Sequence, residues 1–382
     1  MKRAIALLGP EPGSGGGVAN YLALMRRHCA SESSSLPFRF LFLNVGTGRG
    51  HVVASLRRQI CVLRRLSRLR REENLVAVQV HPSLDCRSLL RDSTAVLWAR
   101  MLGLTTIIFV RGWDTRFEKR ILRGSLTGRT IVALFDRADL LLVLSGRFRG
   151  VLMRAGLSGA KIRVSTVMVD PEFLRDLEAR VSSRGSHSGD RDAAGPARIL
   201  FLSRVRRDKG CFQLVAAASD LEEDVEIHIA GEGPDLNELR GLVEHLGMSD
   251  RVTFLGHVEG PAKVAAFADA DLFVLPTSHG EGFPNVIVEA MAAGLPVMAP
   301  AVSAIGEVLD DEDNGFILPD TTVSSVRDGL LRALHSRGSF ARIRENNVLK
   351  ARDQFAVPVV VSGLMAAYRD LLDRTDGHPS GN

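Results

Sequence analysis

The sequence is poor in cysteine and in aromatic side chains. It has 4 cysteines in 382 residues, widely spaced and without a CxxC pair. That spacing suggests neither a disulfide framework nor a zinc site, and it is typical of buried apolar residues in a reducing cytoplasm. Aromatic residues make up only 5% of the chain, and no nucleic-acid-binding motif is present. A nucleic-acid-binding function is therefore weakly supported.

Long apolar runs are also missing. The run in MKRAIALLGP at the start is too short for a signal peptide, and no uninterrupted run approaches the roughly 18 residues of a membrane span. We therefore expect a cytoplasmic protein that is neither exported nor integral to a membrane. A content of 45% hydrophobic and 24% charged residues predicts a globular chain long enough for two domains, each with its own core.

Charge is unevenly distributed along the chain. Residues 1–180 contain 30 Lys and Arg against 14 Asp and Glu, and the remaining residues contain 19 against 30. A basic half is thus joined to an acidic half, which indicates that the two halves have different partners.

Short β-like runs alternate with helical segments in both halves. This βαβ alternation predicts an α/β protein with two doubly wound, mainly parallel sheets, whose ligands bind at the carboxyl ends of the strands. A Ser-, Gly-, Asp- and Arg-rich stretch over residues 179–195 is typical of an exposed linker. The strand candidates are residues 3–8, 38–43, 75–80, 105–110, 140–144, 162–167, 198–202, 225–230, 251–255, 271–275 and 296–299.

One stretch, residues 279–300 (HGEGFPNVIVEAMAAGLPVMAP), carries two carboxylates at a strand–loop–helix junction. Glu281 lies in a glycine-flanked loop, and Glu289 lies eight positions later in a predicted helix. Pro284 suits the first turn of that helix. A helix N-terminus offers unpaired N–H groups, so we expect an anion or a hydroxyl-rich group beside an anion to bind there.

A basic loop in FLSRVRRDKG (residues 201–210) precedes another predicted helix. Arg204 and Lys209 next to a helix N-terminus would hold a diphosphate through charge and N–H donation together, although a solvated basic turn explains this motif alone about as well. Gly231 in IAGEGP could let the backbone approach a base or ribose, and plain turn chemistry explains it nearly as well. The GSGGGV loop (residues 13–18) can wrap a phosphate but matches neither G-x-G-x-x-G nor a P-loop.

Three Asp-x-Asp pairs could in principle hold a divalent ion on a diphosphate: Asp190/Asp192, Asp269/Asp271 and Asp311/Asp313. Such short pairs arise readily in an acidic half. We interpret all three as structural or solvated, and we expect no metal and no cofactor.

The segment over residues 53–71 is a predicted amphipathic helix with many arginines. A layer helix that turns its apolar stripe to its own sheet accounts for the stripe but not for the excess of Arg. Together with the basic half, this favours contact with an anionic membrane surface or another polyanion. His81 and Arg111, each at a predicted strand end, are weaker candidates for substrate binding.

Taken together, these motifs resemble glycosyltransferase family 4, a group of retaining, nucleotide-sugar-dependent enzymes with the GT-B fold, in which two Rossmann-like domains face a central cleft. The string EGFPNVIVEAMAAGLPVMA carries the resemblance, supported by SRVRRDKG, VTFLGHV and GGGVANYLALM. It is strong from residue 198 to about residue 315 and weaker over the N-terminal half. Where many members have His-Gly, this chain has Arg111-Gly112, so the role of that histidine is not carried over.

The resemblance implies a domain plan. We expect an N-terminal acceptor-binding domain over residues 1–178, a linker over 179–196 and a nucleotide-sugar-binding domain over 197–356. It also implies a final helix over 357–374 that packs back on the N-terminal domain, followed by a disordered tail over 375–382.

The resemblance also implies roles for individual residues. Arg204 and Lys209 would hold the donor diphosphate, Glu289 the ribose and Glu281 a hydroxyl of the donor sugar. Gly16 and Gly17 would let the N-terminal domain close over the diphosphate. The loop that would give backbone contacts to sugar and phosphate comprises Gly282, Phe283, Pro284 and Asn285.

We therefore predict a retaining hexosyltransferase that moves a sugar from a nucleoside-diphosphate sugar to an acceptor hydroxyl in cell-surface polysaccharide or glycolipid synthesis. The acceptor would be a glycan or a lipid-linked group, at the inner face of the plasma membrane. Two alternatives remain: a nucleotide-sugar epimerase of the same fold and a non-catalytic polyanion-binding protein.

Overall fold

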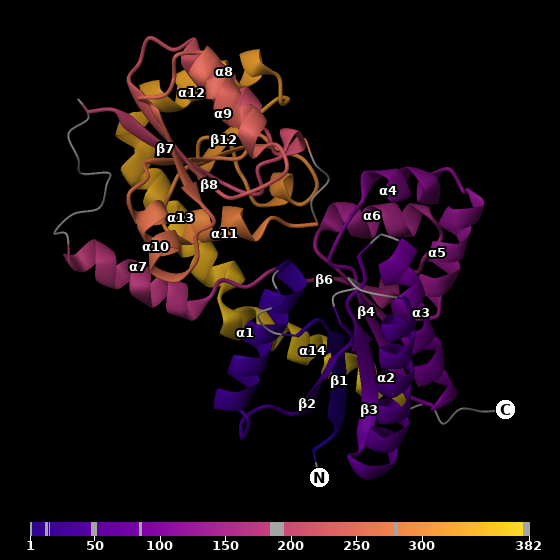
Figure 1. The fold of residues 1–382 in the computed structure, drawn as a ribbon. Coiled ribbons are helices and arrows are strands. Elements are labelled where there is room, and N and C mark those ends of the chain that lie inside the picture. Colours follow the sequence, from indigo (N-terminus) through magenta and orange to yellow (C-terminus); the bar gives the residue numbers. More distant parts are fainter. Residues whose placement is uncertain are drawn as a thin grey trace. The chain divides into compact units, whose positions relative to one another are not determined.

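A computed structural model describes residues 2–11, 14, 16–46, 52–83, 86–183, 195–278 and 282–376. These ranges form two six-stranded parallel sheets with helices between successive strands (Figure 1). The strands are short and mostly apolar, and central ones such as β1 (Ala4–Gly9), β5 (Leu140–Val143) and β11 (Val297–Pro300) are almost fully buried, as parallel sheets covered by helices require. The predicted α/β class with two doubly wound sheets is confirmed.

The chain divides into two compact units. The N-terminal unit comprises Met1–Met168, Gly280–Phe283 and Val357–Asn382, and the C-terminal unit comprises Val169–His279 and Pro284–Ala356. The predicted N-terminal domain extended to residue 178, whereas the helix α7 (Pro171–Ser183) packs on α10 (Gly260–Ala268) within the C-terminal unit. Phe173 of α7 meets the ring of Phe267 edge-on at a centroid distance of 5.4 Å.

The sheet of the N-terminal unit has the order β2-β1-β3-β4-β5-β6, with every pair parallel. Strand order reverses at β1, so the crevice between β1 and β3 is the topological switch point of this sheet. Both strands are almost entirely buried. The strands are β1 (Ala4–Gly9), β2 (Arg39–Asn44), β3 (Leu75–Val80), β4 (Thr105–Phe109), β5 (Leu140–Val143) and β6 (Ile162–Val164).

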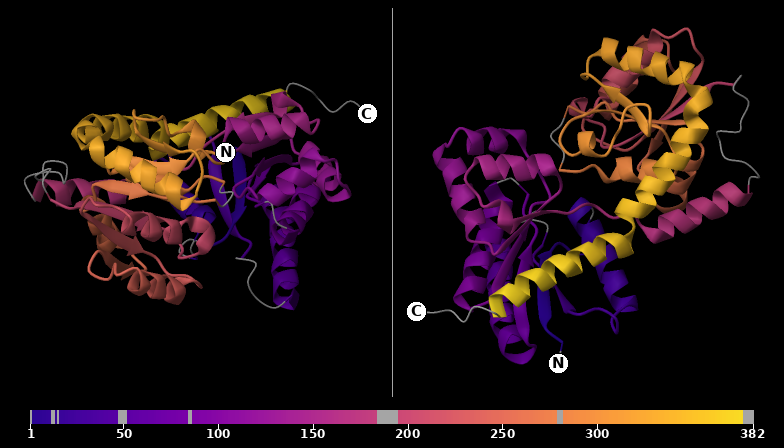
Figure 2. Two further views of the ribbon diagram at one scale, coloured as in Figure 1. Left: turned by 90° about the horizontal axis from the view of Figure 1, so that it is seen from above. Right: turned by 180° about the vertical axis from the view of Figure 1, so that it is seen from behind.

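Helices cover this sheet (Figure 2). The first helix packs on β1 and β2, and the second and third pack on β3. The helices between these strands are α1 (Gly17–Ser31), α2 (Val52–Glu72), α3 (Cys86–Met101), α4 (Thr115–Leu122), α5 (Leu126–Asp136) and α6 (Gly146–Arg154).

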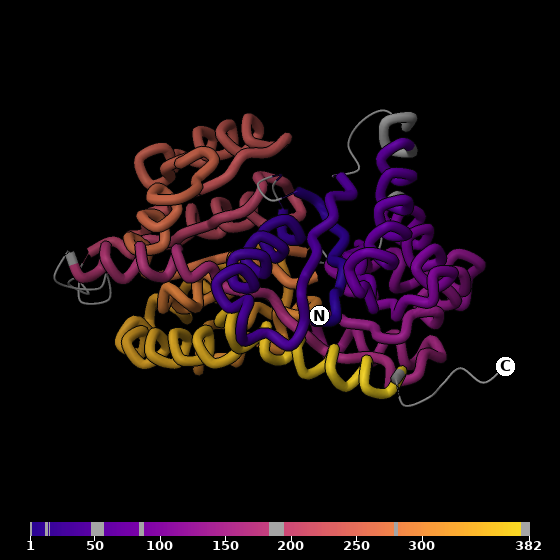
Figure 3. The backbone as a smooth tube through the Cα atoms, turned by 90° about the horizontal axis from the view of Figure 1, so that it is seen from below, coloured from indigo at the N-terminus to yellow at the C-terminus, as the bar shows by residue number. Residues whose placement is uncertain are grey.

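The final helix of the chain, α14 (Val357–Asp376), belongs to the N-terminal unit, where it packs on α1 (Figure 3). Its Tyr368 is fully buried and lies near the rings of Phe38 and Phe40. The Tyr368 hydroxyl donates to Gln79 Oε1 on β3 at 2.6 Å. The helix extends through residue 376, two residues beyond its predicted end.

The sheet of the C-terminal unit has the order β12-β11-β10-β7-β8-β9, again with every pair parallel. This is the doubly wound order in which the first strand of the unit, β7, lies beside the fourth, β10. The crevice outside their carboxyl ends is the switch point. The strands are β7 (Ala197–Leu202), β8 (Val225–Ala230), β9 (Val252–Gly256), β10 (Leu272–Val274), β11 (Val297–Pro300) and β12 (Gly315–Leu318).

Seven helices in the described part of this unit surround its sheet. Besides α7 and α10, they are α8 (Cys211–Ser219), α9 (Leu236–His245), α11 (Asn285–Ala292), α12 (Val323–His335) and α13 (Phe340–Phe355). The eleven predicted strands all exist, with ends shifted by up to three residues. Strand β12 and the helices α12 and α13 had not been predicted.

Candidate functional site

The candidate site is built on the loops that follow β7 and β10 in the C-terminal unit. The first loop leads through a 3₁₀ turn (Arg207–Lys209) into α8, and the second leads into α11. The two loops are tied together, because the carbonyl oxygen of Asp208 accepts from Ser278 N at 3.0 Å and from Thr277 Oγ1 at 3.2 Å. The basic loop thus has a fixed place at the switch point.

Gly210 makes this close approach possible. It caps the N-terminus of α8 with φ +84°, a left-handed conformation that disfavours side chains. A Cβ atom at Gly210 would lie 2.1 Å from the carbonyl oxygen of Pro276. Replacing Gly210 would therefore push the two loops apart.

Lys209 directly precedes this helix. Its side chain is buried, and its pKa is lowered to about 8, mainly by burial; Asp208 opposes this shift, and the positive charges of Arg206 and Arg204 add to it. Arg204 is exposed, and α8 has neither a side-chain cap nor an acidic residue in its first turn. Lys209 thus lies beside an uncapped helix N-terminus, close enough to Arg204 for the charge of that residue to lower its pKa, which is an arrangement suited to an anion.

Glu289 lies on α11 and is buried. Its Oε1 accepts from Lys263 Nζ of α10 at 2.7 Å. Its Oε2 is buried and has no hydrogen-bond partner among the described residues. One oxygen is therefore fixed by an ion pair while the other remains an available acceptor, as the recognition of a hydroxyl group requires.

Lys263 had not been predicted as a site residue. It lies in the first turns of α10, and only the fold shows its partner, since its Nζ reaches Glu289 of α11. Its Nζ also lies 5.6 Å from the centroid of the Phe173 ring. A lysine within GPAKVAAFA carries no motif of its own, so the sequence offered no signal for it.

Gly231 lies at the end of β8 with φ +141°. A Cβ atom there would lie 1.9 Å from the carbonyl oxygen of Ser203, and one at Gly233 would lie 2.1 Å from that of Val205. Both glycines therefore let this turn pack against the basic loop. This packing agrees with the interpretation of Gly231 as a turn residue. Contact of Gly231 with a nucleotide stays a prediction.

The remaining predicted residues lie in several places. Pro284 is the N-cap of α11 and Asn285 its first residue, whereas Gly282 and Phe283 group with the N-terminal unit. Gly16 is the N-cap of α1 with φ +92°, and Gly17 begins that helix. Glu281 lies outside the described residues.

Comparison with known proteins identifies the domain that contains this site. Residues 189–349 match the family model described as glycosyl transferases group 1. The putative colanic acid biosynthesis glycosyltransferase WcaL of Escherichia coli (strain K12) is 30% identical over 205 residues, covering 52% of this chain and 48% of that protein. Residues 189–349 are a group 1 glycosyltransferase domain.

Further similarities agree with this assignment. The phosphatidyl-myo-inositol mannosyltransferase of Mycobacterium leprae (strain TN) is 38% identical over 146 residues, covering 36% of this chain and 37% of that protein. The crystal structure of Anabaena Alr3699/HepE in complex with UDP and glucose matches with a TM-score of 0.71 at 17% identity, covering 96% of this chain and 100% of that chain. The fold is GT-B. The chain spans about half the length of WcaL and less of the mannosyltransferase.

The acidic pairs of the glycosyltransferase domain make structural contacts. Asp311 pairs with Arg332 at 2.9 Å, Asp313 pairs with Arg342 at 3.1 Å, and Asp271 accepts from the backbone N–H of Arg198. Asp190 and Asp192 lie outside the described residues. Among the described residues no cluster of three or more metal-ligating side chains was found.

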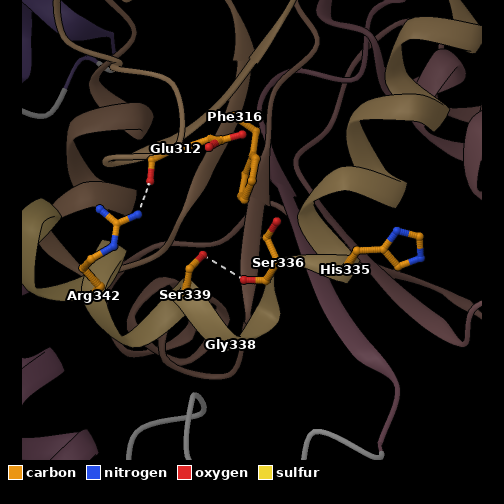
Figure 4. Close-up of a pocket in the computed structure, with 7 residues that line it drawn as sticks. All are labelled: Glu312, Phe316, His335, Ser336, Gly338, Ser339 and Arg342. Carbon is orange, nitrogen blue, oxygen red and sulfur yellow. Dashed lines mark hydrogen bonds between the residues drawn. The ribbon is translucent and has the colours of Figure 1, made fainter.

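A pocket of about 250 Å³ lies elsewhere in this domain, beside β12, the end of α12 and the start of α13 (Figure 4). Its polar groups bond largely to one another: Arg342 donates to the carbonyl oxygen of Glu312 at 2.8 Å, and Ser339 Oγ donates to that of Ser336 at 2.8 Å. It contains none of the predicted site residues, and we assign it no role.

In the N-terminal unit, His81 follows β3 at the switch point and is buried. Its Nδ1 lies 2.9 Å from the carbonyl oxygen of Leu8, and its Nε2 lies 2.9 Å from Gln79 Nε2. Because a carbonyl oxygen can only accept, Nδ1 carries the hydrogen and Nε2 accepts from the amide. Burial lowers the pKa of His81 to about 3, so the ring is neutral and both its nitrogens are engaged within the fold.

Proposed function

We propose that this chain is a retaining glycosyltransferase that moves a sugar from a nucleoside-diphosphate sugar to an acceptor hydroxyl in polysaccharide or glycolipid synthesis. The observation that carries the proposal is the buried Lys209 at the uncapped N-terminus of α8, at the switch point of a group 1 glycosyltransferase domain. The unpartnered Oε2 of Glu289 supplies an acceptor on the same domain.

In this mechanism the leaving diphosphate gains negative charge as the glycosidic bond breaks. Lys209, Arg204 and the N–H groups that begin α8 stabilise that charge, and they act electrostatically without a covalent step. Glu289 binds the ribose hydroxyls through Oε2, and Lys263 holds the carboxylate in place. Glu281 binds a hydroxyl of the donor sugar, and the departing phosphate accepts the proton of the acceptor hydroxyl.

The donor nucleotide is open to a direct screen. The Anabaena protein was solved with UDP and glucose, so UDP-glucose is the first donor to test here, beside a GDP-sugar and an ADP-sugar. Binding of one nucleotide sugar and not of the others would assign the donor.

We also propose that the N-terminal unit contacts an anionic membrane surface. Exposed arginines line α2, and none of them pairs with a carboxylate within the described residues. Exposed apolar side chains lie close by, Ile60 on α2 and Leu90 and Met101 on the adjacent α3. No described helix is long and apolar enough to span a membrane. The exposed arginines of α2 are Arg57, Arg58, Arg64, Arg65, Arg68, Arg70 and Arg71.

The deciding experiment is sugar transfer by Lys209→Ala. We expect a loss of roughly 100- to 1000-fold in kcat, because removing one preformed stabiliser of a developing negative charge has about that effect. Glu281→Ala should lose most activity as well. Circular dichroism checks that the fold is kept, and wild-type rates in both variants would refute the proposal.

Arg207→Ala is the matched control. Arg207 lies in the same loop, but its guanidinium is exposed, pairs with Glu238 and lies over the ring of Phe212. Its removal should leave kcat unchanged, since its guanidinium is already paired with Glu238. A chelator should likewise have little effect on the rate.

An epimerase of the same fold is the second candidate function. Incubation with the donor alone separates the two, because an epimerase converts the sugar without an acceptor. A transferase hydrolyses the donor slowly at most, so an inverted sugar in the product would favour the epimerase.

A further inference from the structure

Arg111 is a buried cation at the carboxyl edge of the N-terminal sheet, two residues after the end of β4. Its side chain is only 8% exposed. Its guanidinium carbon lies 4.0 Å from the centroid of the Tyr21 ring and 4.6 Å from that of Phe109. The planar group is thus held by aromatic rings, which supply attraction but no countercharge.

Among the residues that the structure describes, the guanidinium has no anionic partner. Nη1 is buried and has no hydrogen-bond partner within the described ranges, and no described carboxylate forms an ion pair with Arg111. Burial lowers the pKa of Arg111 to about 10, with a smaller opposing contribution from Tyr21. Buried charges are normally paired because desolvation without a partner is strongly unfavourable.

A second unpartnered group lies in the same cluster. The Tyr21 hydroxyl is buried and has no hydrogen-bond partner in the described part of the chain, and burial raises the pKa of Tyr21, so the hydroxyl stays a neutral O–H donor. Tyr21 belongs to α1, which begins at Gly17 with no side-chain cap and no acidic residue in its first turn. Two unsatisfied donors and a positive helix end thus occur on neighbouring elements.

The backbone of Arg111 is fixed as well. Its N–H donates to the carbonyl oxygen of Pro82 at 2.9 Å, and the next residue, Gly112, forms a β-bridge with Ser83. A Cβ atom at Gly112 would lie 2.6 Å from Ser83 Oγ. The guanidinium is therefore set on a rigid edge, as expected of a preorganised binding group.

We propose that Arg111 and the Tyr21 hydroxyl bind an oxyanion of the sugar substrate, a carboxylate or a phosphate on the glycosyl group that the N-terminal unit recognises. An oxyanion matches the planar fork of N–H donors and neutralises the buried charge, which a neutral sugar hydroxyl cannot do. The proposal rests on the proposed function only in taking the ligand to be a sugar.

Titration calorimetry on the full chain tests this with three probes: glucose, glucuronate and glucose 6-phosphate. We expect at least one acidic sugar to bind about 10- to 100-fold more tightly than glucose, the range for a charge-assisted hydrogen bond. Arg111→Met should abolish that preference. The acidic sugar that binds more tightly assigns the oxyanion to a carboxylate or to a phosphate.

Variants separate this site from the diphosphate site and from a purely structural role. Lys209→Ala should keep the preference for acidic sugars, and so should Arg116→Ala, whose exposed guanidinium pairs with Asp114. Should Arg111→Met fail to fold, Arg111→Lys carries the test, because it keeps the charge but loses the fork and should reduce the preference.

Equal binding of all three sugars by the wild type would overturn the inference, as would a preference that survives in a folded Arg111 variant. A different set of results would refute the proposed function. Absence of transfer with every donor, together with Arg111-dependent binding of an acidic sugar, would reject sugar transfer and leave the oxyanion site standing.

Discussion

Lys209 is a cation with little access to water. Its pKa of about 8 means that a moderate rise in pH removes its charge in the unliganded protein. A bound diphosphate favours the charged form, so binding and protonation of Lys209 are linked.

We therefore expect the affinity for a nucleoside diphosphate to be nearly constant up to about pH 7, to fall about twofold by pH 8 and to weaken further above pH 8. The weakening approaches about tenfold per pH unit until the pKa of the complex is reached. Titration calorimetry with UDP across this range measures it. Lys209→Arg should bind with little pH dependence, because arginine stays charged, and an unchanged pH profile in that variant would point to another titrating group.

Some site residues were predictable from the sequence and others were not. The place of Arg204 and Lys209 in a loop between a strand and a helix was predictable because such a cation-rich loop has a recognisable order along the chain, and their binding of a diphosphate stays a prediction. The Lys263–Glu289 ion pair was not predictable, because its residues are 26 positions apart on two different helices and meet only in the folded domain. The burial of Arg111 between two rings also depends on distant residues, Tyr21 among them.

The strands were the most predictable elements. The run of β3 matches its predicted range because both faces of this parallel strand are largely buried, and β8 matches through its alternating buried apolar residues. Strand β12 has only four residues and follows an acidic turn. Its apolar run was therefore too short to be predicted as a strand. Helix α7 runs to Ser183, past the predicted start of the linker, because Phe173 and its neighbours pack on α10.

Helix α2 is the element whose composition the fold alone does not explain. Val62, Leu66 and Leu69 are buried and suffice to hold it on the sheet. The arginines on its exposed surface add nothing to that packing, so they remain available to an anionic surface.

We expect Arg64→Gln, Arg65→Gln and Arg68→Gln together to weaken binding to phosphatidylserine-containing liposomes by roughly 100-fold, since each basic residue contributes about 1 kcal/mol at such a surface. Sedimentation with liposomes at low and high salt measures the change, and binding should be salt-sensitive. Equal binding to neutral liposomes, or none to either kind, would count against membrane contact.

Three arginines of the C-terminal unit provide the matched control. Arg327, Arg342 and Arg352 pair with Asp328, Asp313 and Asp353, respectively. Changing these three arginines to Gln removes the same amount of positive charge from the protein. Unchanged liposome binding by this variant would show that the position of the arginines on α2 matters, and that the net charge of the protein does not.

The molecule as a whole is made of two units, and the chain crosses between them more than once. The N-terminal unit is completed by α14, whose Tyr368 fills the space beside Phe38 and Phe40 and bonds to Gln79. The stability of the first unit therefore depends on the last helix of the chain.

We expect Tyr368→Ala to lower the free energy of unfolding of the N-terminal unit by about 3–5 kcal/mol, the usual effect of removing a large buried aromatic ring. Tyr368→Phe should cost only about 1–3 kcal/mol, because it keeps the ring but leaves Gln79 Oε1 without its donor. Hydrogen exchange resolved by segment measures both. Protection should fall in β1 and β3 and stay unchanged in β7 and β8; an equal loss in both sheets would show that the two units unfold together.

The position of α14 also orders events during synthesis on the ribosome. Residues 1–168 emerge first, yet the helix that covers Phe38 and Phe40 begins only at Val357. At about 5–20 residues per second, the intervening segment takes on the order of 10 to 40 seconds to be made. The C-terminal sheet, whose strands lie entirely within that segment, is thus complete before the nascent N-terminal sheet receives its last helix, and during that interval a chaperone has an exposed aromatic surface to bind.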